Sequence, residues 1–311
     1  MDIAAVERFE AGRGRLASLA YRLLGSAADA EDVVQDAFLR WQAADRDYIE
    51  VPEAWLTKVV TNLALDRLRS AKTRRERAVG AWLPEPVLDG DPMLGPAETF
   101  EQRESVSFAV LMLLERLPPT ERAVYVLREA FAYSHSEIAE ILDITESASQ
   151  QHALRARRHV GVRRNAAQID PASARHIVEA FIDAASSGRT ERLVALLTDD
   201  AVAVSDGAGL LDKLMYESVP VRIAATLRAA FKPTPAKHQM VGGSPSFYAA
   251  MVNGAPAILV ALEDRVVGLG ILDVRDGKVA AVHGLAAPAR LGRVTEQWQR
   301  GEHRDPIIEN W

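Results

Sequence analysis

The stretch from Leu117 to Val160 constrains the fold of this chain most, because it predicts three short helices in succession. Residues 120–130 carry apolar side chains at helical spacing behind two prolines, which the first turn of a helix tolerates. Residues 136–142 form a second amphipathic segment, and Asp143 after them is a residue type that accepts positive φ. We interpret these segments as a helix-turn-helix.

The third helix is expected to begin after Thr145, a good N-cap residue, and to run to about Val160. Ser149, Ala153 and Ala156 recur at i, i+4 and i+7, and their small size suits close packing on the second helix. The opposite side is rich in amide and basic groups, which pair with base edges and phosphates in a major groove. The expected base contacts are Gln150, Gln151, His152 and Arg155, and the expected phosphate contacts are Arg157 and Arg158. A solvated helix in an ordinary helical hairpin would show the same pattern.

The composition is that of an ordinary soluble protein, with 311 residues, 48% hydrophobic and 26% charged, which is enough for two or three domains. The net charge of -6 argues against a protein that coats nucleic acid with its whole surface, but it is compatible with local basic clusters. Without cysteine there is no disulfide, thiolate metal site or cysteine nucleophile. The start MDIAAVERFE does not resemble a signal peptide, and no apolar run approaches the ~18 residues of a membrane span. We therefore expect a cytoplasmic protein with no membrane partner and no cofactor.

An acidic helix is predicted close to the N-terminus. Residues 6–24 form one amphipathic helix that ends at Gly25, and Ser26 with Asp29 resembles a capping box for the next helix. The apolar face of this second helix comprises Val33, Val34, Ala37, Phe38 and Trp41. Its acidic and amide side chains lie on the other sides of the helix. Such a surface is either solvated or a docking site for a basic partner helix.

A basic patch follows on the helix predicted after Pro52. The buried stripe of this helix comprises Leu56, Val59, Val60, Leu63, Ala64 and Leu68, and its exposed face carries Lys58, Asn62, Asp66 and Arg69. Six basic residues lie between Arg67 and Arg77, which is more than the helix dipole needs for compensation. We therefore interpret this end of the helix as a patch that tracks phosphates.

Residues 78–96 contain four prolines and three glycines and show no periodicity. This pattern predicts a linker, in which Trp82 and Leu83 can anchor on a neighbouring surface. The helical pattern returns at 97–117 and leads into the helix-turn-helix.

Beyond Arg164 the character of the sequence changes. Residues 172–197 predict two helices, and short β-type runs follow from Val202, separated by the turn signals Asn253-Gly254 and Asp276-Gly277. This mixture predicts an α+β domain, distinct from the helical first half. The end of the chain reads as a polar tail with one helix around 296–299.

The two helical blocks together resemble the conserved regions of bacterial extracytoplasmic-function (ECF) sigma factors. YRLLGSAADAEDVVQDAFLRW is similar to the segment with which that family grips RNA polymerase, and AWLTKVVTNLALDRLRSAKTRRE to the segment that melts and reads the -10 promoter element. LPPTERAVYVLREAFAYSHSEIAEILDITESASQQHALRARRHV is similar to the region that reads the -35 element. WLPEP at 82–86 and the α+β extension resemble the sigma factor J type, in which a SnoaL-like domain is fused to the C-terminus.

This resemblance implies a multidomain fold with two all-α sigma domains, the second a helix-turn-helix, followed by an α+β SnoaL-like domain of the cone-shaped barrel type. The implied boundaries are region 2 at 1–77, a linker at 78–100, region 4 at 101–164, the SnoaL-like domain at 170–291 and a tail at 292–311. The implied function is an RNA polymerase sigma factor that binds core polymerase, recognises both promoter elements and starts transcription. The fused domain is expected to modulate that activity.

The resemblance also assigns roles to single residues. The residues expected to face the polymerase clamp are Asp29, Asp32, Gln35, Asp36 and Phe38. A melted strand is held by a cationic groove with base capture, and the residues expected near the -10 strand are Lys58, Asn62, Asp66, Arg67, Arg69, Lys72 and Arg74. The -35 edges are assigned to the third-helix residues named above. Regulatory contacts between domains are assigned to Trp82, Leu83, Pro84, Asp206 and Gly207.

The sequence departs from the pattern of this subgroup in three places. DGAGLLDK at 206–213 stands where a DGGGK-like motif is typical, and AAPARL at 286–291 replaces an NPDKL-like motif. Gln150 stands where many relatives have arginine, which implies a distinct -35 preference.

Two other functions stay open. A helix-turn-helix regulator with a small-molecule-sensing domain explains the third helix and the extension, but not the acidic helix or the first basic patch; co-purification with core polymerase separates the two hypotheses. An enzyme in the SnoaL-like domain would need an Asp/His pair, for which the candidates are Asp206, His238 and His283. Because the sequence shows no pairing among them and a fold does not imply a function, we expect no catalysis. Whether this domain binds a small-molecule ligand is left open.

Overall fold

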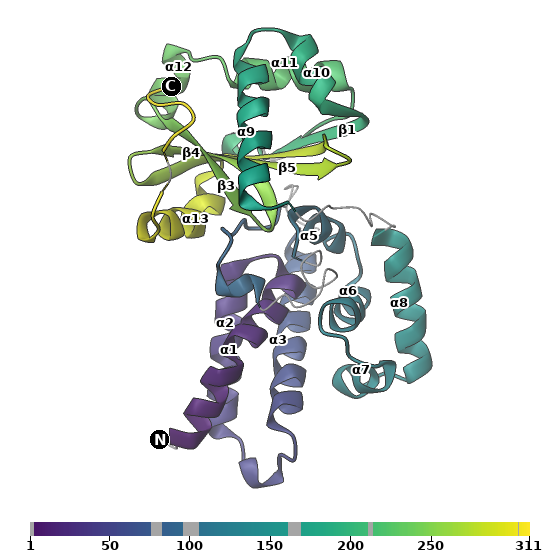
Figure 1. The fold of residues 1–311 in the computed structure, drawn as a ribbon. Coiled ribbons are helices and arrows are strands. Elements are labelled where there is room, and N and C mark those ends of the chain that lie inside the picture. Colours follow the sequence, from purple (N-terminus) through teal and green to yellow (C-terminus); the bar gives the residue numbers. More distant parts are fainter. Residues whose placement is uncertain (1–2, 76–82, 96–105, 161–168, 211–213, 304) are drawn as a thin grey trace. The chain divides into compact units, whose positions relative to one another are not determined.

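A computed structural model describes residues 3–75, 83–95, 106–160, 169–210, 214–303 and 305–311 of the chain. The chain divides into a helical unit, Met1–Ala78 with Gly90–Arg163, and an α+β unit, Val79–Asp89 with Arg164–Trp311 (Figure 1). Within the described residues, no helix combines the length and the hydropathy that crossing a membrane requires.

The helical unit begins with three long helices that pack on one another, followed by a group of shorter ones (Figure 1). The long helices are α1 (Ile3–Leu24), α2 (Ala27–Ala43) and α3 (Pro52–Arg75), with a 3-10 turn η1 (Arg46–Tyr48) between the last two. The shorter elements are η2 (Pro92–Leu94), α5 (Phe108–Leu114), α6 (Pro119–Tyr125), the π-helical turn η3 (Val126–Ala130), α7 (His135–Leu142) and α8 (Glu146–Val160).

Several local signals of the sequence are confirmed in this unit. The Ser26 hydroxyl accepts the Asp29 amide N–H at 3.2 Å, and the Thr145 hydroxyl accepts that of Ala148 at 3.1 Å. Asp143 adopts φ 53° and ψ 47°, so it makes the left-handed turn between α7 and α8. The single helix predicted over 120–130 is wrong in one respect, because its second half is the π-helical turn η3.

The α+β unit is built on one six-stranded sheet in the order β2-β1-β6-β5-β4-β3. Neighbouring strands are antiparallel except β1 and β6, which are parallel. The strands are β1 (Leu197–Ser205), β2 (Met215–Glu217), β3 (Ser246–Val252), β4 (Ala255–Leu262), β5 (Arg265–Arg275) and β6 (Lys278–Leu285). The predicted turns are confirmed, since both residues of Asn253-Gly254 and of Asp276-Gly277 have positive φ.

Helices cover both faces of this sheet. Phe181 and Ile182 pack with Leu272 of β5 in one buried cluster, whereas Ile271, the alternate neighbour of Leu272, is buried on the other side. The first face is covered by α9 (Pro171–Ser186), α10 (Thr190–Leu196) and α11 (Pro220–Ala230). The remaining elements are η4 (Gly207–Gly209), α12 (Pro235–Val241) and α13 (Pro288–Arg300), of which α13 packs on β5.

The end of the chain is more structured than a polar tail. The helix expected around 296–299 is α13, which is 13 residues long and buries Leu291, Val294 and Trp298. After it, Ile308 pairs with Phe247 of the edge strand β3 in an isolated antiparallel bridge. The Trp311 indole N–H donates to the Phe231 carbonyl at 2.9 Å, so these residues complete the edge of the sheet.

Candidate nucleic-acid interface and linker site

Helix α8 presents a buried stripe and an exposed stripe. Ser149, Ala153 and Ala156 are buried, as their spacing predicted, and α8 packs on α6 and α7. Gln150 and Gln151 are exposed, and the Gln150 side-chain amide donates to Glu146 at 3.3 Å. The amide groups on the exposed side are therefore available to base edges.

The structure places two of the expected base contacts beside an acidic residue of α6. The Arg155 Nε donates to Glu121 Oε1 at 2.7 Å, and a guanidinium nitrogen of Arg155 lies 2.8 Å from His152 Nδ1. The Glu121 side chain is only 8% exposed, so this ion pair is partly shielded from water. His152 and Arg155 thus lie towards α6, on a different side of the helix from Gln150.

The two expected phosphate contacts differ in their partners. Arg157 donates to Glu129 of η3 at 2.7 and 2.9 Å, and both side chains are partly exposed. Arg158 is exposed on the side of α8 opposite the buried stripe. Exposed ion pairs contribute about 0–1 kcal/mol, so a phosphate can replace Glu129 as the partner of Arg157 at little cost.

The residues expected near the -10 strand lie on α3. The Lys58 ammonium donates to the Glu140 carbonyl at 2.8 Å and to Asp143 at 3.0 Å, while Arg69 pairs with Asp66 at 3.3 Å. Asn62 is half-buried. The side chains of Lys72 and Arg74 lie outside the described residues.

The acidic residues of α2 converge on one arginine of α3. Arg67 donates to Asp29 at 3.0 Å and to Asp32 at 3.2 Å, and it lies 3.9 Å from Asp36. Gln35 is exposed, whereas Phe38 is half-buried against the Phe9 ring. This surface also carries Leu39, which is 54% exposed. Leu39 was not among the residues predicted for this surface, although an apolar residue outside the apolar face of α2 is a signal visible in the sequence.

A second exposed side chain was missed in the turn between α2 and α3. Tyr48 is 84% exposed in η1, next to the exposed Val51. An exposed aromatic ring can stack on an unpaired base. Tyr48 was not predicted as a site residue, because helical periodicity carries no information about a short turn between two amphipathic helices.

Tyr133 and Arg22 join the three long helices to the shorter ones. The Tyr133 hydroxyl accepts from Arg15 of α1 at 3.0 Å and lies 3.1 Å from the Thr57 hydroxyl of α3. Arg22 of α1 is buried beside the Phe131 ring, and burial lowers the pKa of its guanidinium to about 10. The Tyr133–Thr57 contact and the bonds of Lys58 together hold α3 against α7 and the residues that flank it.

The segment expected to be a linker is anchored at both ends. Arg22 donates to the Leu94 carbonyl at 3.1 Å, and Gly95, at φ 69°, has no room for a Cβ because it would overlap the Ser18 side chain. Residues 83–89 instead fold as part of the α+β unit. Trp82 lies outside the described residues, whereas Leu83 and Pro84 are buried.

Residues 83–89 pair with the end of β3 as a short antiparallel strand. Leu88 bridges Val252, the Asn253 N–H donates to the Val87 carbonyl at 3.0 Å, and the Asp89 N–H donates to the Met251 carbonyl at 3.0 Å. The Asn253 side-chain oxygen accepts the Val87 N–H at 3.1 Å. Gln297 of α13 accepts the Leu88 N–H at 3.0 Å, and Arg290 donates to the Leu83 carbonyl. Both Leu83 and Val87 are fully buried, so the segment is part of this unit's core.

The candidate acid/base residues of the α+β unit lie in three different elements: Asp206 follows β1, His238 is on α12 and His283 is on β6. Both carboxylate oxygens of Asp206 accept backbone N–H groups, from Ala208, Ala286 and Ala287 at 3.0–3.2 Å. Asp206 thereby fixes the loop after β1, which contains Gly207, to the connection between β6 and α13. His283 is buried on β6, and the His238 ring lies 5.7 Å from that of Trp311.

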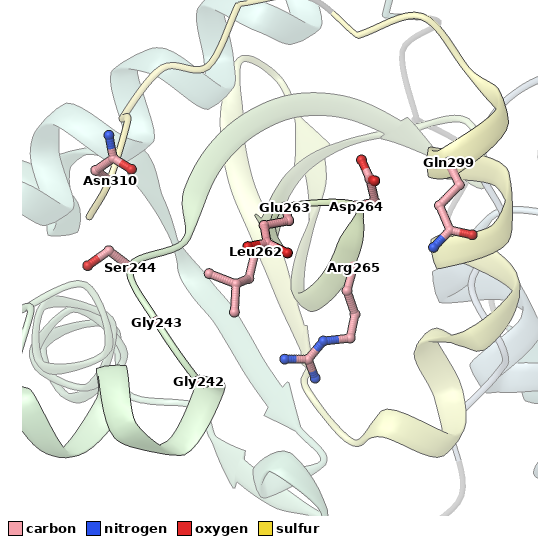
Figure 2. Close-up of a pocket in the computed structure, with 9 residues that line it drawn as sticks. All are labelled: Gly242, Gly243, Ser244, Leu262, Glu263, Asp264, Arg265, Gln299 and Asn310. Atoms are coloured by element: carbon pink, nitrogen blue, oxygen red, sulfur yellow. The ribbon is translucent and has the colours of Figure 1, made fainter.

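A cavity of about 510 Å³ opens at the end of α12 (Figure 2). It is lined by Gly242, Gly243 and Ser244, by the β4–β5 turn with Glu263 and Asp264, and by Leu262, Arg265, Gln299 and Asn310. None of the candidate residues Asp206, His238 and His283 is among these lining residues. The Arg265 guanidinium is bound to the Val241 carbonyl at 2.8 Å, which caps the last turn of α12.

Comparison with known proteins identifies the family. Residues 5–74 match sigma-70 region 2, and residues 107–160 match sigma-70 region 4. The chain is 37% identical over 294 residues to "ECF RNA polymerase sigma factor SigJ" of Mycobacterium tuberculosis, covering 92% of this chain and 93% of that protein. It is 34% identical over 288 residues to "Probable ECF RNA polymerase sigma factor SigI" of the same species, covering 91% and 93%.

A solved structure supports the same conclusion. The crystal structure of M. tuberculosis SigJ matches this chain with a TM-score of 0.68 at 32% identity, covering 92% of this chain and 97% of that one. The chain therefore belongs to the ECF RNA polymerase sigma factor family, whose members are transcription initiation factors. The predicted fold, two helical sigma domains followed by an α+β SnoaL-like domain, is confirmed, as is the predicted sigma factor function.

Removing the Tyr133 hydroxyl is expected to loosen the contact between α3 and α7. Tyr133→Phe deletes two hydrogen bonds at about 0.5–1.5 kcal/mol each, and it leaves the candidate DNA contacts intact. Because the chain has no cysteine, dyes can be attached at Gln42→Cys on α2 and Ser136→Cys on α7. Single-molecule energy transfer then reports the distance between these two helices. We expect a larger low-transfer population in Tyr133→Phe, with Tyr48→Phe as the matched control. Identical distributions for the two variants would show that Tyr133 does not hold the blocks together.

Proposed function

We propose that this sigma factor reads the -35 element with α8, holds the -10 strand along α3 and docks on core polymerase through the acidic surface of α2. The exposed amides and arginines of α8, the cationic side chains of α3 and the paired acids of α2 support these roles. The same proposal places the protein in the cytoplasm with RNA polymerase and promoter DNA as its partners.

The helical unit has to open for this function. The -35 and -10 elements are about 25 base pairs apart, which corresponds to roughly 85 Å of duplex. Lys58 of α3, however, lies 3.0 Å from Asp143 at the start of the turn into α8. Because α8 follows this turn directly, α3 and α8 are held too close together to occupy both elements, so they have to move apart on the promoter.

Separation of α3 from α8 requires the linker between α3 and α5 to extend. About 30 residues join α3 to α5, and they reach roughly 100 Å when fully extended. Folding residues 83–89 into the α+β unit and residues 92–95 onto α1 removes much of that length. We therefore propose that the α+β domain modulates transcription by retaining the linker, and the strand pairing of Leu88 with Val252 is the observation that carries this proposal.

Release of the linker is costly enough to matter. Exposing Leu83 and Val87 costs about 1.5–3 kcal/mol for each side chain, and each backbone hydrogen bond adds about 0.5–1.5 kcal/mol. Contacts with core polymerase and DNA have to offset this cost. The domain is thus expected to lower output, and we assign it no catalytic role, because both carboxylate oxygens of Asp206 already hold backbone amides.

Run-off transcription with purified core polymerase tests the proposal. Val87→Ser weakens the buried anchor of the linker, so promoter-dependent output is expected to exceed that of the unsubstituted protein. Leu210→Ser, at a residue that is 76% exposed in the same unit, is the matched control and is expected to leave output unchanged. Equal output from Val87→Ser and the unsubstituted protein would reject the regulatory role. Absence of any promoter-dependent transcript would reject the sigma factor roles proposed for α3 and α8.

The division between reading and positioning on α8 gives a second test. Gln151→Ala is expected to cost about 1–3 kcal/mol at one base pair and to relax preference there. Arg157→Ala is expected to weaken all promoters alike and to reduce the slope of log affinity against log salt concentration by about 1. Binding of the polymerase complex to a promoter panel at several salt concentrations measures both. A change of sequence preference in Arg157→Ala would contradict this division.

A further inference from the structure

The exposed stripe of α8 can be located from the buried one. Ser149, Ala153, Ala156 and Val160 are buried and follow the spacing i, i+4, i+7, i+11. Each residue turns the helix by about 100°, so a stripe displaced by two residues lies about 200° away. That displaced stripe has the same spacing and consists of Ser147, Gln151, Leu154 and Arg158, all of which are exposed.

This stripe defines the side of α8 that points away from the rest of the helix-turn-helix. Gln150 lies to one flank with Glu146, and His152 and Arg155 lie to the other flank with Glu121. Figure 1 shows α8 at the edge of the helical unit. The surface best placed to enter a groove is therefore the stripe itself. Leu154 is the one residue of the stripe whose side chain has no polar group.

Leu154 is a large apolar side chain at the centre of this polar surface. It is 51% exposed, whereas Val160, the other large apolar residue of α8, is buried. Gln151 precedes it by three residues and Arg158 follows it by four, so all three share one face. The major-groove edge of B-DNA carries one apolar group, the C5-methyl of thymine.

We propose that Leu154 is a specificity-determining residue that contacts the C5-methyl of a thymine in the -35 element. This inference rests on the proposed role of α8. Three residues of helix rise about 4.5 Å, and one base-pair step of B-DNA rises about 3.4 Å, so the thymine lies one or two pairs from the base read by Gln151. Arg158, one turn further on, fixes the helix through a phosphate.

The experiment removes the methyl group without changing hydrogen bonding. A preferred -35 sequence is first selected from a randomised promoter library with the full-length protein and core polymerase. Each thymine of that sequence is then replaced singly by deoxyuridine, and binding of the complex is measured. Loss of one buried methyl contact is expected to weaken binding about four-fold at one position.

The variants identify which side chain senses the methyl group. In Leu154→Ala the deoxyuridine effect at that position is expected to disappear, whereas in Gln151→Ala it is expected to stay about four-fold. An equal deoxyuridine effect in Leu154→Ala, or no effect at any thymine with the unsubstituted protein, would overturn the assignment of Leu154 alone. Failure of the unsubstituted protein to select any -35 sequence would overturn the proposed role of α8 and this inference with it.

Discussion

A short antiparallel pairing between residues 83–89 and the end of β3 makes part of the segment between α3 and α5 a component of the α+β unit of this sigma factor. Leu88 bridges Val252, and backbone bonds on either side of this pair complete the strand. The segment supplies buried side chains to the core of the α+β unit, so it is structural rather than loosely attached. Because it is also part of the covalent connection between α3 and α5, its state limits how far α3 and α8 can separate.

The helical unit holds the other end of the same connection by different physical means. The Arg22 guanidinium is buried, donates to the Leu94 carbonyl and lies over the Phe131 ring, and its lowered pKa reflects the cost of that burial. Gly95 approaches Ser18 so closely that only glycine fits. Removing either the buried charge or the backbone carbonyl that it binds would leave a buried polar group unpaired, which costs free energy. This cost favours the observed position of the linker backbone.

The sequence predicted those parts of the structure that depend on short-range patterns. Asp143 in the turn, Thr145 at the cap and the Asn253-Gly254 hairpin follow from the conformational preferences of single residues. Pairing between Leu88 and Val252 could not be predicted, because seven residues with two prolines carry no periodicity and their partner lies more than 160 positions away. The attachment of Arg155 to Glu121 was missed for the same reason, whereas Leu154 could have been found, because it breaks the polar pattern of its own stripe.

A reversible covalent lock tests the linker account most directly. Leu88 and Val252 lie opposite each other but exchange no backbone hydrogen bonds with one another. In antiparallel pairs this arrangement brings the two Cα atoms closer together, within the range that a disulfide requires. Leu88→Cys with Val252→Cys can therefore form a disulfide in a chain that has no other cysteine. Run-off transcription is then measured with the oxidised and the reduced forms, and with the unsubstituted protein under both conditions. The account predicts that oxidation lowers the output of the double variant and that reduction restores it. Equal output from the two forms would show that the linker stays on the α+β domain during initiation, which would contradict the account.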